Sequence, residues 1–179
     1  MIKVIASDMD GTLLGNDHKV APQTLQAIHA ACDAGIRFII ATGRNFRGAM
    51  EELKDIDIVC DYVVGSGAEV RDQNQQIIST APLSIKLCEA IYEDLKEFPV
   101  SIIFTSGSYD YRIGTKEEIE ESFLKQIQLF HEDTGQDVDE KEILSSPLYR
   151  RIVENTKIIS EFQELKESNV SVYKVFLYS

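Results

Sequence analysis

The chain has 179 residues, of which 44% are hydrophobic and 27% charged, and its formal net charge is −12. That length allows one well-packed core, or one core with a small second module. The negative charge disfavours a nucleic-acid partner, because binding nucleic-acid phosphates requires Lys and Arg. No apolar run reaches the roughly eighteen residues of a membrane-spanning helix, and the N-terminus does not resemble a secretory signal. We therefore expect no membrane partner and a cytoplasmic location.

Cysteine and histidine positions indicate neither a disulfide framework nor a metal site. The cysteines are spread along the chain and form no CxxC pair: Cys32, Cys60 and Cys88. The histidines lie far apart, without the spacing of metal ligands: His18, His29 and His131. We expect the cysteines to be small buried hydrophobic residues, and we do not expect zinc.

The first half of the chain alternates between apolar runs and helical patterns. Residues 2–7 are apolar and largely β-branched, which predicts a buried parallel strand. Pro22 suits the first turn of a helix. Residues 37–41 predict a second buried strand, residues 46–53 a second helix and residues 62–64 a third strand. This order predicts an α/β fold with a three-stranded parallel sheet and an uncovered edge.

The second half has a different texture, which begins near residue 81. An amphipathic helix is expected over residues 83–98, and Ser106-Gly107-Ser108 then predicts a hairpin between two strands. The pattern beyond residue 98 predicts strands over 100–105 and 109–113, then a helix that Thr115 caps and that runs to about residue 132. A loop is expected over 135–139, a strand over 148–153, a helix over 158–167 and a strand over 170–178. We therefore predict a first domain over residues 1–81 and a separate α+β domain over residues 82–179.

The loops after the three predicted parallel strands carry polar or glycine residues. Asp8 and Asp10 follow the first strand, Thr42-Gly43-Arg44 follows the second, and Gly65-Ser66-Gly67 follows the third. In open α/β sheets, ligands bind at the carboxyl ends of the strands. The sequence therefore predicts a ligand site at this edge of the sheet.

Asp8 and Asp10 have the chemistry for one phosphoryl-transfer reaction. One Asp can attack phosphorus to form an aspartyl-phosphate, and the other can protonate the leaving oxygen and later deprotonate a water. Mg²⁺ favours such oxygen ligands and offsets the repulsion between anionic nucleophile and anionic substrate. Amides around Met9, the Thr42 hydroxyl and the Gly43 amide can bind the phosphate. A calcium-like loop or a solvated turn is the alternative explanation of the acid pair.

Asp8-Met9-Asp10-Gly11-Thr12-Leu13-Leu14 and Ala41-Thr42-Gly43-Arg44 resemble the first two motifs of the haloacid dehalogenase (HAD) superfamily, and most closely its Cof-type phosphatases. Gly67-Ala68 fits that branch too, although Ser66 replaces the usual Asn. The resemblance implies a Rossmann-like core with an inserted α/β cap domain. It also implies Asp8 as nucleophile, Asp10 as acid/base, Mg²⁺ on the Asp8 carboxylate and the Asp10 carbonyl, and Thr42 on the phosphate. The implied substrate is a small phosphate ester such as a sugar phosphate.

Two further elements of that family are missing from this sequence. They are a phosphate-binding Lys after the cap domain and a Gly-Asp-x-x-Asn-Asp stretch that completes the metal site. No Gly follows Gly135, no Asp follows Asp139, and the late Lys residues lie in cap-like elements. We therefore expect a truncated chain with an incomplete core. Alone, it should bind Mg²⁺ weakly and have little phosphatase activity.

Other functions fit parts of the same pattern. A non-catalytic phosphometabolite-binding or regulatory module would share the acid pair and lack the later elements. A phosphoacceptor signalling domain needs an Asp after the third strand, where Gly65-Ser66-Gly67 stands, and dinucleotide binding needs a third glycine and a following helix. Tyr109, Tyr111 and Arg112 can be substrate contacts or ordinary strand residues, and the second is the commoner role. Substrate identity and oligomeric state are left open.

Overall fold

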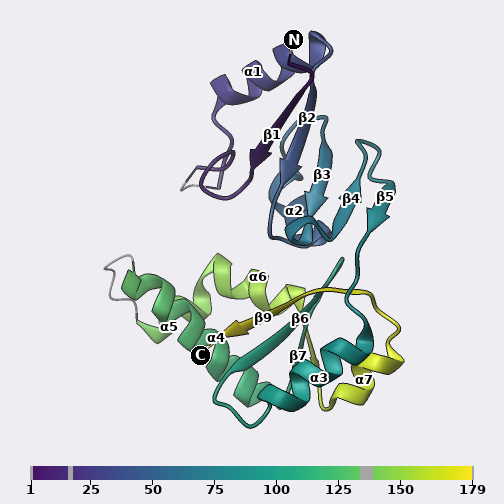
Figure 1. Ribbon diagram of the computed structural model, residues 1–179. Helices are drawn as coiled ribbons and strands as arrows, with labels where there is room; N and C mark the ends of the chain where they lie inside the picture. The colour runs from purple at the N-terminus through teal and green to yellow at the C-terminus, as the bar shows by residue number, and fades with distance from the viewer. Residues whose placement is uncertain (1, 16–17, 134–138, 179) are drawn as a thin grey trace. The chain divides into compact units, whose positions relative to one another are not determined.

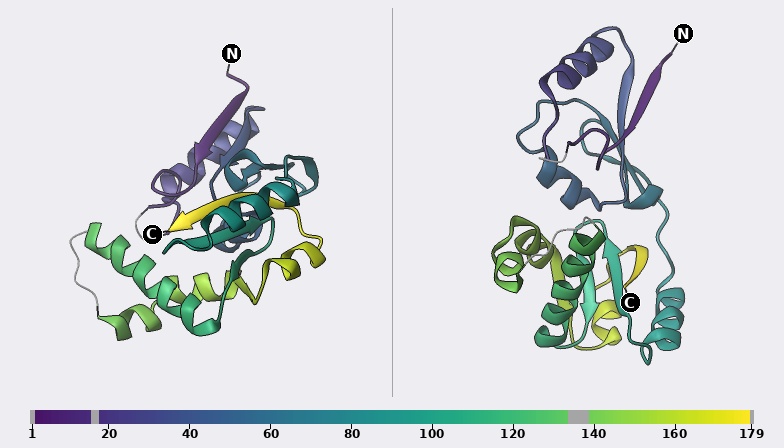
Figure 2. Two further views of the ribbon diagram at one scale, coloured as in Figure 1. Left: turned by 60° about the horizontal axis from the view of Figure 1, so that its bottom comes forward. Right: turned by 90° about the vertical axis from the view of Figure 1, so that its left-hand side faces the viewer.

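The computed structural model describes residues 2–15, 18–133 and 139–178 and divides into two compact units, Met1–Pro82 and Leu83–Ser179. Each unit has its own sheet, which can be followed in Figures 1 and 2. Each unit also has its own cluster of buried apolar side chains. Within these described ranges, no helix is both long and apolar enough to cross a membrane.

The first unit contains a five-stranded sheet in the order β1-β2-β3-β4-β5. Its strands are β1 (Val4–Asp8), β2 (Arg37–Ala41), β3 (Asp61–Val64), β4 (Glu69–Arg71) and β5 (Ile77–Thr80). The first three run parallel, as predicted, and β4 and β5 extend the sheet in antiparallel pairs. The predicted α/β fold is confirmed, but the sheet is mixed and has five strands rather than three, because β4 and β5 extend it beyond β3.

The helices α1 (Pro22–Asp33) and α2 (Phe46–Leu53) connect the parallel strands at the predicted places. Alternate side chains of a strand lie on one face of its sheet, so one face of β2 and β3 can be fully buried. The side chains that pack with these helices are Phe38, Ile40, Tyr62 and Val64, with Ile28 of α1 and Leu53 of α2. This core holds the ends of the strands in fixed register.

The strand β1 corrects one prediction, because it is parallel but not buried. Val4 is 49% exposed and Ile5 is 37% exposed. In the described part of the chain, β1 lies at the edge of the sheet and pairs with β2 alone. A β-branched apolar run is typical of a strand with two neighbours, and composition cannot tell how many neighbours are present.

The second unit contains a four-stranded sheet in the order β8-β7-β6-β9. Its strands are β6 (Ser101–Ser106), β7 (Asp110–Ile113), β8 (Thr156–Ile159) and β9 (Val172–Tyr178). Its helices are α3 (Ile85–Leu95), α4 (Lys116–Asp133), α5 (Glu140–Ser145), α6 (Pro147–Asn155) and α7 (Phe162–Glu167). The helices α3 and α7 share a core with the sheet, built from Cys88, Phe104, Tyr111, Phe162, Leu165 and Val172. The predicted β6–β7 hairpin is confirmed.

The predicted strand over residues 148–153 is wrong, because this segment belongs to helix α6. Pro147 occupies the first turn of the helix, where its missing N–H costs nothing. Ser146 precedes it as N-cap, and its Oγ accepts a hydrogen bond from Tyr149 N at 3.1 Å. These local start signals outweigh the β-branched residues that suggested a strand.

The predicted helix over residues 158–167 is wrong in its first part. Residues 156–159 form β8, which pairs in parallel with β7, and the helix begins only at Phe162 as α7. The pairing partner lies more than forty residues earlier in the sequence, so no local pattern signals it. Of the predicted loop 135–139, residues 135–138 lie outside the described residues.

The cysteines agree with their predicted role. Cys60 and Cys88 are buried, Cys32 is half-buried, and all three are free thiols. Burial raises the pKa of Cys60 to about 11, so this thiol stays protonated at neutral pH.

Candidate active site

The loop after β1 exposes its carboxylates because its apolar side chains are buried. Three of these side chains are at most 4% exposed: Met9, Leu13 and Leu14. Backbone hydrogen bonds fold the loop back, with Leu13 N donating to Asp8 O at 3.2 Å and Leu14 N to Met9 O at 2.8 Å. Gly11 has φ +73°, a conformation that glycine adopts without strain. Asp8 and Asp10 remain exposed at the surface of this loop.

The ends of the three parallel strands lie at one level of the sheet. Asp8 pairs in register with Ala41, and Ala41 pairs with Val63. Thr42 follows directly and is 6% exposed, and its amide donates to Val63 O at 2.9 Å. Its Oγ1 accepts a hydrogen bond from Arg44 N at 3.2 Å, which leaves the hydroxyl hydrogen to donate elsewhere. Gly43 lies exposed between them.

The third loop joins the same edge through its backbone. It forms the short 3₁₀ turn η1 (Gly65–Gly67), in which Gly65 N donates to Arg44 O at 2.7 Å and Ser66 N donates to Thr42 O at 3.2 Å. Ser66 has φ 59°, in the left-handed region that Asn adopts more readily than Ser. The Ser at this position therefore carries more backbone strain than the usual Asn would.

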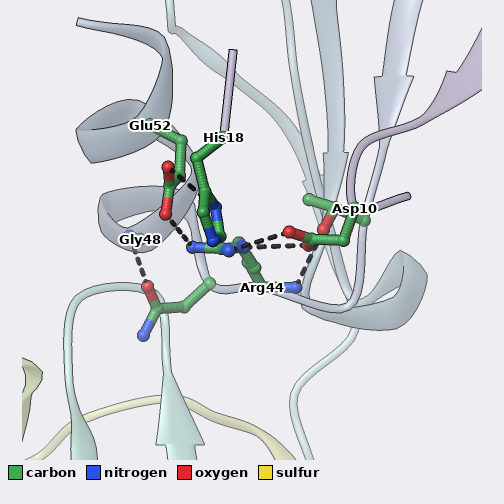
Figure 3. Close-up of polar contacts among 7 residues, drawn as sticks. Asp10, His18, Arg44, Gly48 and Glu52 are labelled. Atoms are coloured by element: carbon green, nitrogen blue, oxygen red, sulfur yellow. Dashed lines mark hydrogen bonds and ion pairs between the residues drawn. The ribbon is translucent and has the colours of Figure 1, made fainter. Parts of the chain in front are cut away.

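Arg44, to which the sequence assigned no role, binds two carboxylates (Figure 3). Its Nε donates to Asp10 Oδ2 at 2.9 Å, and its Nη2 donates to Asp10 Oδ1 at 2.8 Å. Its Nη1 donates to Glu52 Oε1 at 2.8 Å. His18 Nδ1 lies 3.6 Å from the second oxygen of Glu52. An Arg after the second strand signals a partner for the acids at that edge, whereas Glu52 on α2 requires the folded structure to be found.

The surroundings of Arg44 keep its charge in place. Burial alone would lower the pKa of Arg44, but the hydrogen bonds and charges of Asp10 and Glu52 outweigh burial and raise this pKa. The Glu52 side chain is 6% exposed, whereas that of Asp10 is 47% exposed. The guanidinium therefore joins a buried carboxylate to a solvent-facing one.

The helix α2 fixes the backbone next to this cluster. Asn45 is its N-cap, and Asn45 Oδ1 accepts a hydrogen bond from Gly48 N at 2.7 Å (Figure 3). A Cβ at Gly48 would lie 3.1 Å from that oxygen, so glycine leaves room for the cap. The cap holds the start of the helix directly after Arg44, and Glu52 lies on the same helix.

The oxygen ligands available at this edge of the sheet suit Mg²⁺, both because they are oxygens and because they are few. Among the residues that the structure describes, no three His, Cys, Asp or Glu side chains gather as a metal site. Mg²⁺ takes one or two carboxylates and commonly keeps several waters. Asp8 offers an exposed carboxylate. The Asp10 carboxylate is bound to Arg44, so Asp10 is better suited to offer its backbone carbonyl, as the resemblance implies.

Comparison with known proteins extends over nearly the whole chain. A family model of haloacid dehalogenase-like hydrolases matches residues 5–178. YxeH of Bacillus subtilis, named as a candidate phosphatase, is 30% identical over 136 residues, which are 72% of this chain and 50% of YxeH. An HMP-PP phosphatase of Yersinia pestis is 34% identical over 91 residues, which are 51% of this chain and 33% of that protein. The chain thus spans half or less of the length of these curated relatives.

Solved structures show the same fold. A haloacid dehalogenase-like hydrolase from B. subtilis has a TM-score of 0.74 and 22% identity, covering 99% of this chain and 62% of that one. The HAD subclass IIB sugar phosphatase BT4131 has a TM-score of 0.61 and 20% identity, covering 94% of this chain and 56% of that one. At these identities the likeness concerns the fold alone.

Proposed function

The chain belongs to the haloacid dehalogenase-like hydrolases, and from this we propose that it carries the nucleophile of a Mg²⁺-dependent phosphatase for small phosphorylated metabolites. The observation that carries the proposal is the placement of Asp8 and Thr42 at one level of the sheet, with exposed Asp10 in the same loop. The phosphatase names of its relatives support the reaction class. Sugar phosphates are one candidate substrate class, because a subclass IIB sugar phosphatase shares the fold.

The roles follow from what each group can do. The Asp8 carboxylate attacks phosphorus, and the bond from phosphorus to the ester oxygen breaks while Asp10 gives that oxygen a proton. Asp10 then accepts a proton from a water that attacks the aspartyl-phosphate, which releases phosphate and restores Asp8. Amides near Met9 and Gly43 and the Thr42 hydroxyl bind the phosphate oxygens.

The metal belongs to the same loop. The Asp8 carboxylate and the Asp10 carbonyl would hold Mg²⁺, which neutralises charge on the phosphate when it is bound. We assign the first unit, Met1–Pro82, to the beginning of the catalytic core and the second unit, Leu83–Ser179, to the cap domain. The separate sheet and core of each unit support this assignment.

The decisive experiment substitutes the nucleophile. In the complete protein with Mg²⁺, Asp8→Asn should lower turnover of small phosphate esters by at least about a thousandfold without changing the thermal unfolding temperature. Asp33→Asn, at an exposed aspartate that ends α1, is the matched control and should leave turnover unchanged. A chelator should abolish activity, and added Mg²⁺ should restore it. Turnover that survives Asp8→Asn excludes the proposed nucleophile.

A second candidate function is a phosphometabolite-binding module without turnover. It would bind phosphate through the same Thr42 hydroxyl and Gly43 amide, without the reaction at Asp8. Binding of a sugar phosphate by calorimetry, with no phosphate release from a panel of esters, would support it over the phosphatase.

A further inference from the structure

We propose that Arg44 is a positioning residue for Asp10, and that Glu52 holds Arg44 in the position from which it acts. The proposal rests on the proposed function, in which Asp10 transfers the proton. It starts from the three hydrogen bonds that join Asp10, Arg44 and Glu52 (Figure 3). None of these contacts involves the attacking oxygen of Asp8.

The contact between Arg44 and Asp10 constrains orientation as well as distance. Two parallel N–H groups of the guanidinium meet the two oxygens of one carboxylate at 2.9 and 2.8 Å. Such a bidentate pair fixes the plane of the carboxylate, which one hydrogen bond or a Lys ammonium cannot do. Asp10 needs that constraint, because its side chain is 47% exposed and an exposed side chain that no contact fixes can adopt several rotamers.

The guanidinium is itself held from its buried side. Its Nη1 donates to Glu52, whose side chain is 6% exposed and lies on α2. The backbone of Arg44 is fixed at both groups, since its N–H donates to Thr42 Oγ1 and its carbonyl accepts from Gly65 N. Glu52 and the backbone after β2 therefore hold Arg44 in place, and Arg44 in turn positions Asp10.

Positioning leaves Asp10 able to react. An ionised carboxylate has about four lone-pair sites, and Arg44 occupies two of them. One oxygen can therefore carry a proton towards the leaving ester oxygen while the other keeps its bond to Arg44. Loss of the two hydrogen bonds from Arg44 would let the Asp10 carboxylate rotate. The rate should then fall only for reactions in which the leaving group needs a proton from Asp10.

The test compares two leaving groups in the complete, Mg²⁺-loaded protein. A p-nitrophenolate leaves without protonation, whereas an alkoxide needs an acid, and kcat/KM reports the step up to the aspartyl-phosphate. Arg44→Ala should lower kcat/KM for an alkyl phosphate about 10- to 100-fold and for p-nitrophenyl phosphate less than about threefold. Arg44→Lys should behave like Arg44→Ala, because Lys keeps the charge but cannot form the two parallel hydrogen bonds to Asp10.

Further variants separate this role from folding. Glu52→Gln keeps an acceptor for Arg44 and should lower the alkyl phosphate rate about three- to tenfold, again with little effect on p-nitrophenyl phosphate. Lys54→Ala, at an exposed residue directly after α2, is the matched control and should change neither rate. Added guanidinium ion should partly restore Arg44→Ala on the alkyl phosphate.

The outcomes are distinct. Equal losses on both esters, or no loss on either, overturn the positioning role while the phosphatase proposal stands. An unsubstituted complete protein that releases no phosphate from any ester overturns both. A loss confined to the alkyl phosphate, shared by the Arg44 and Glu52 variants, supports the proposal.

Discussion

Two arginines, Arg44 in the first unit and Arg112 in the second, hold the same guanidinium group in contrasting surroundings. Arg44 is half-buried, and the carboxylates of Asp10 and Glu52 raise its pKa in spite of burial. Arg112 is only 3% exposed, and its pKa is lowered to about 10 because burial removes it from water. One cation is held by charges, and the other is held by packing.

The contacts of Arg112 are mainly those of a core residue. Its Nη1 donates to Ser122 Oγ at 3.1 Å, and its guanidinium lies 4.3 Å from the centre of the Phe123 ring. Asp110, two residues earlier on β7, and to a smaller extent Tyr178 oppose the lowering of its pKa. These contacts favour the structural role over a substrate contact, the two roles that the sequence left open.

Position along the strand separates the two arginines. Arg44 lies beyond the end of β2, where the chain leaves the sheet, whereas Arg112 lies within β7 and pairs in register with Ile103. A charge at a strand end can meet a ligand, and a charge inside a covered strand must be satisfied by the protein. Substitutions at Arg44 should therefore change turnover more than stability, and substitutions at Arg112 should do the reverse.

The largest expected difference in stability tests this contrast directly. Arg112→Ala should lower the free energy of unfolding by about 3 kcal/mol, because it removes buried stem packing and the cation beside Asp110. Arg44→Lys, which keeps a charge near Glu52, should cost less than about 1 kcal/mol. Urea denaturation measures both values. Equal costs at the two sites would break the comparison.

A volume-matched change sharpens the same contrast. Arg112→Met keeps most of the packing but removes the cation beside Asp110, so it should cost about 2 kcal/mol, below the alanine variant. Should Arg112→Met prove as damaging as Arg112→Ala, the charge rather than the packing holds this part of the second unit.

A smaller effect is expected at the helix start that follows Arg44. Asn45→Ala should cost about 1 kcal/mol, because it removes the acceptor of Gly48 N. Asn45→Asp keeps an acceptor and should restore most of that stability. Thermal unfolding measures the loss of stability. If Asn45→Ala also lowers the rate for an alkyl phosphate and Asn45→Asp does not, the cap helps to hold Arg44 in position.

The smallest effect concerns pH and a carboxylate of the second unit. Thr115 N donates to Glu118 Oε2 at 2.8 Å, and this hydrogen bond lowers the pKa of Glu118 below its ordinary value of 4.5. The ionised form therefore stabilises the fold above pH 4.5, and this contribution is lost as the pH falls through the lowered pKa. Glu118→Gln should flatten that part of the stability profile and leave turnover unchanged. If the stability of Glu118→Gln falls with acid as that of the unsubstituted protein does, the hydrogen bond to Glu118 does not contribute as expected.

Local signals account for much of what the sequence predicted. The bounds of β2 and α2 match the predicted ranges, and Thr115 and Glu118 form a reciprocal cap at the start of α4. The missed helix α6 had local start signals at Ser146 and Pro147, whereas β8 is a strand only because β7 lies beside it. The contact of Arg44 with Asp10 likewise joins residues that lie 34 positions apart, so no local pattern signals it. Both acids were visible from the sequence, whereas the hydrogen bonds that join Asp10 to Arg44 were not.

The buried residues of the first loop have a practical consequence for anyone who transplants this site. Met9, Leu13 and Leu14 occupy the core beneath the loop, and the two acids face outward as a result. A graft of Asp8 and Asp10 onto another scaffold would also need an apolar core that accepts these three side chains. It would need space for the loop backbone that folds back beneath the acids. The seven-residue motif over residues 8–14 thus also anchors the loop, and copying its two acids without its buried apolar residues would leave two ordinary surface aspartates.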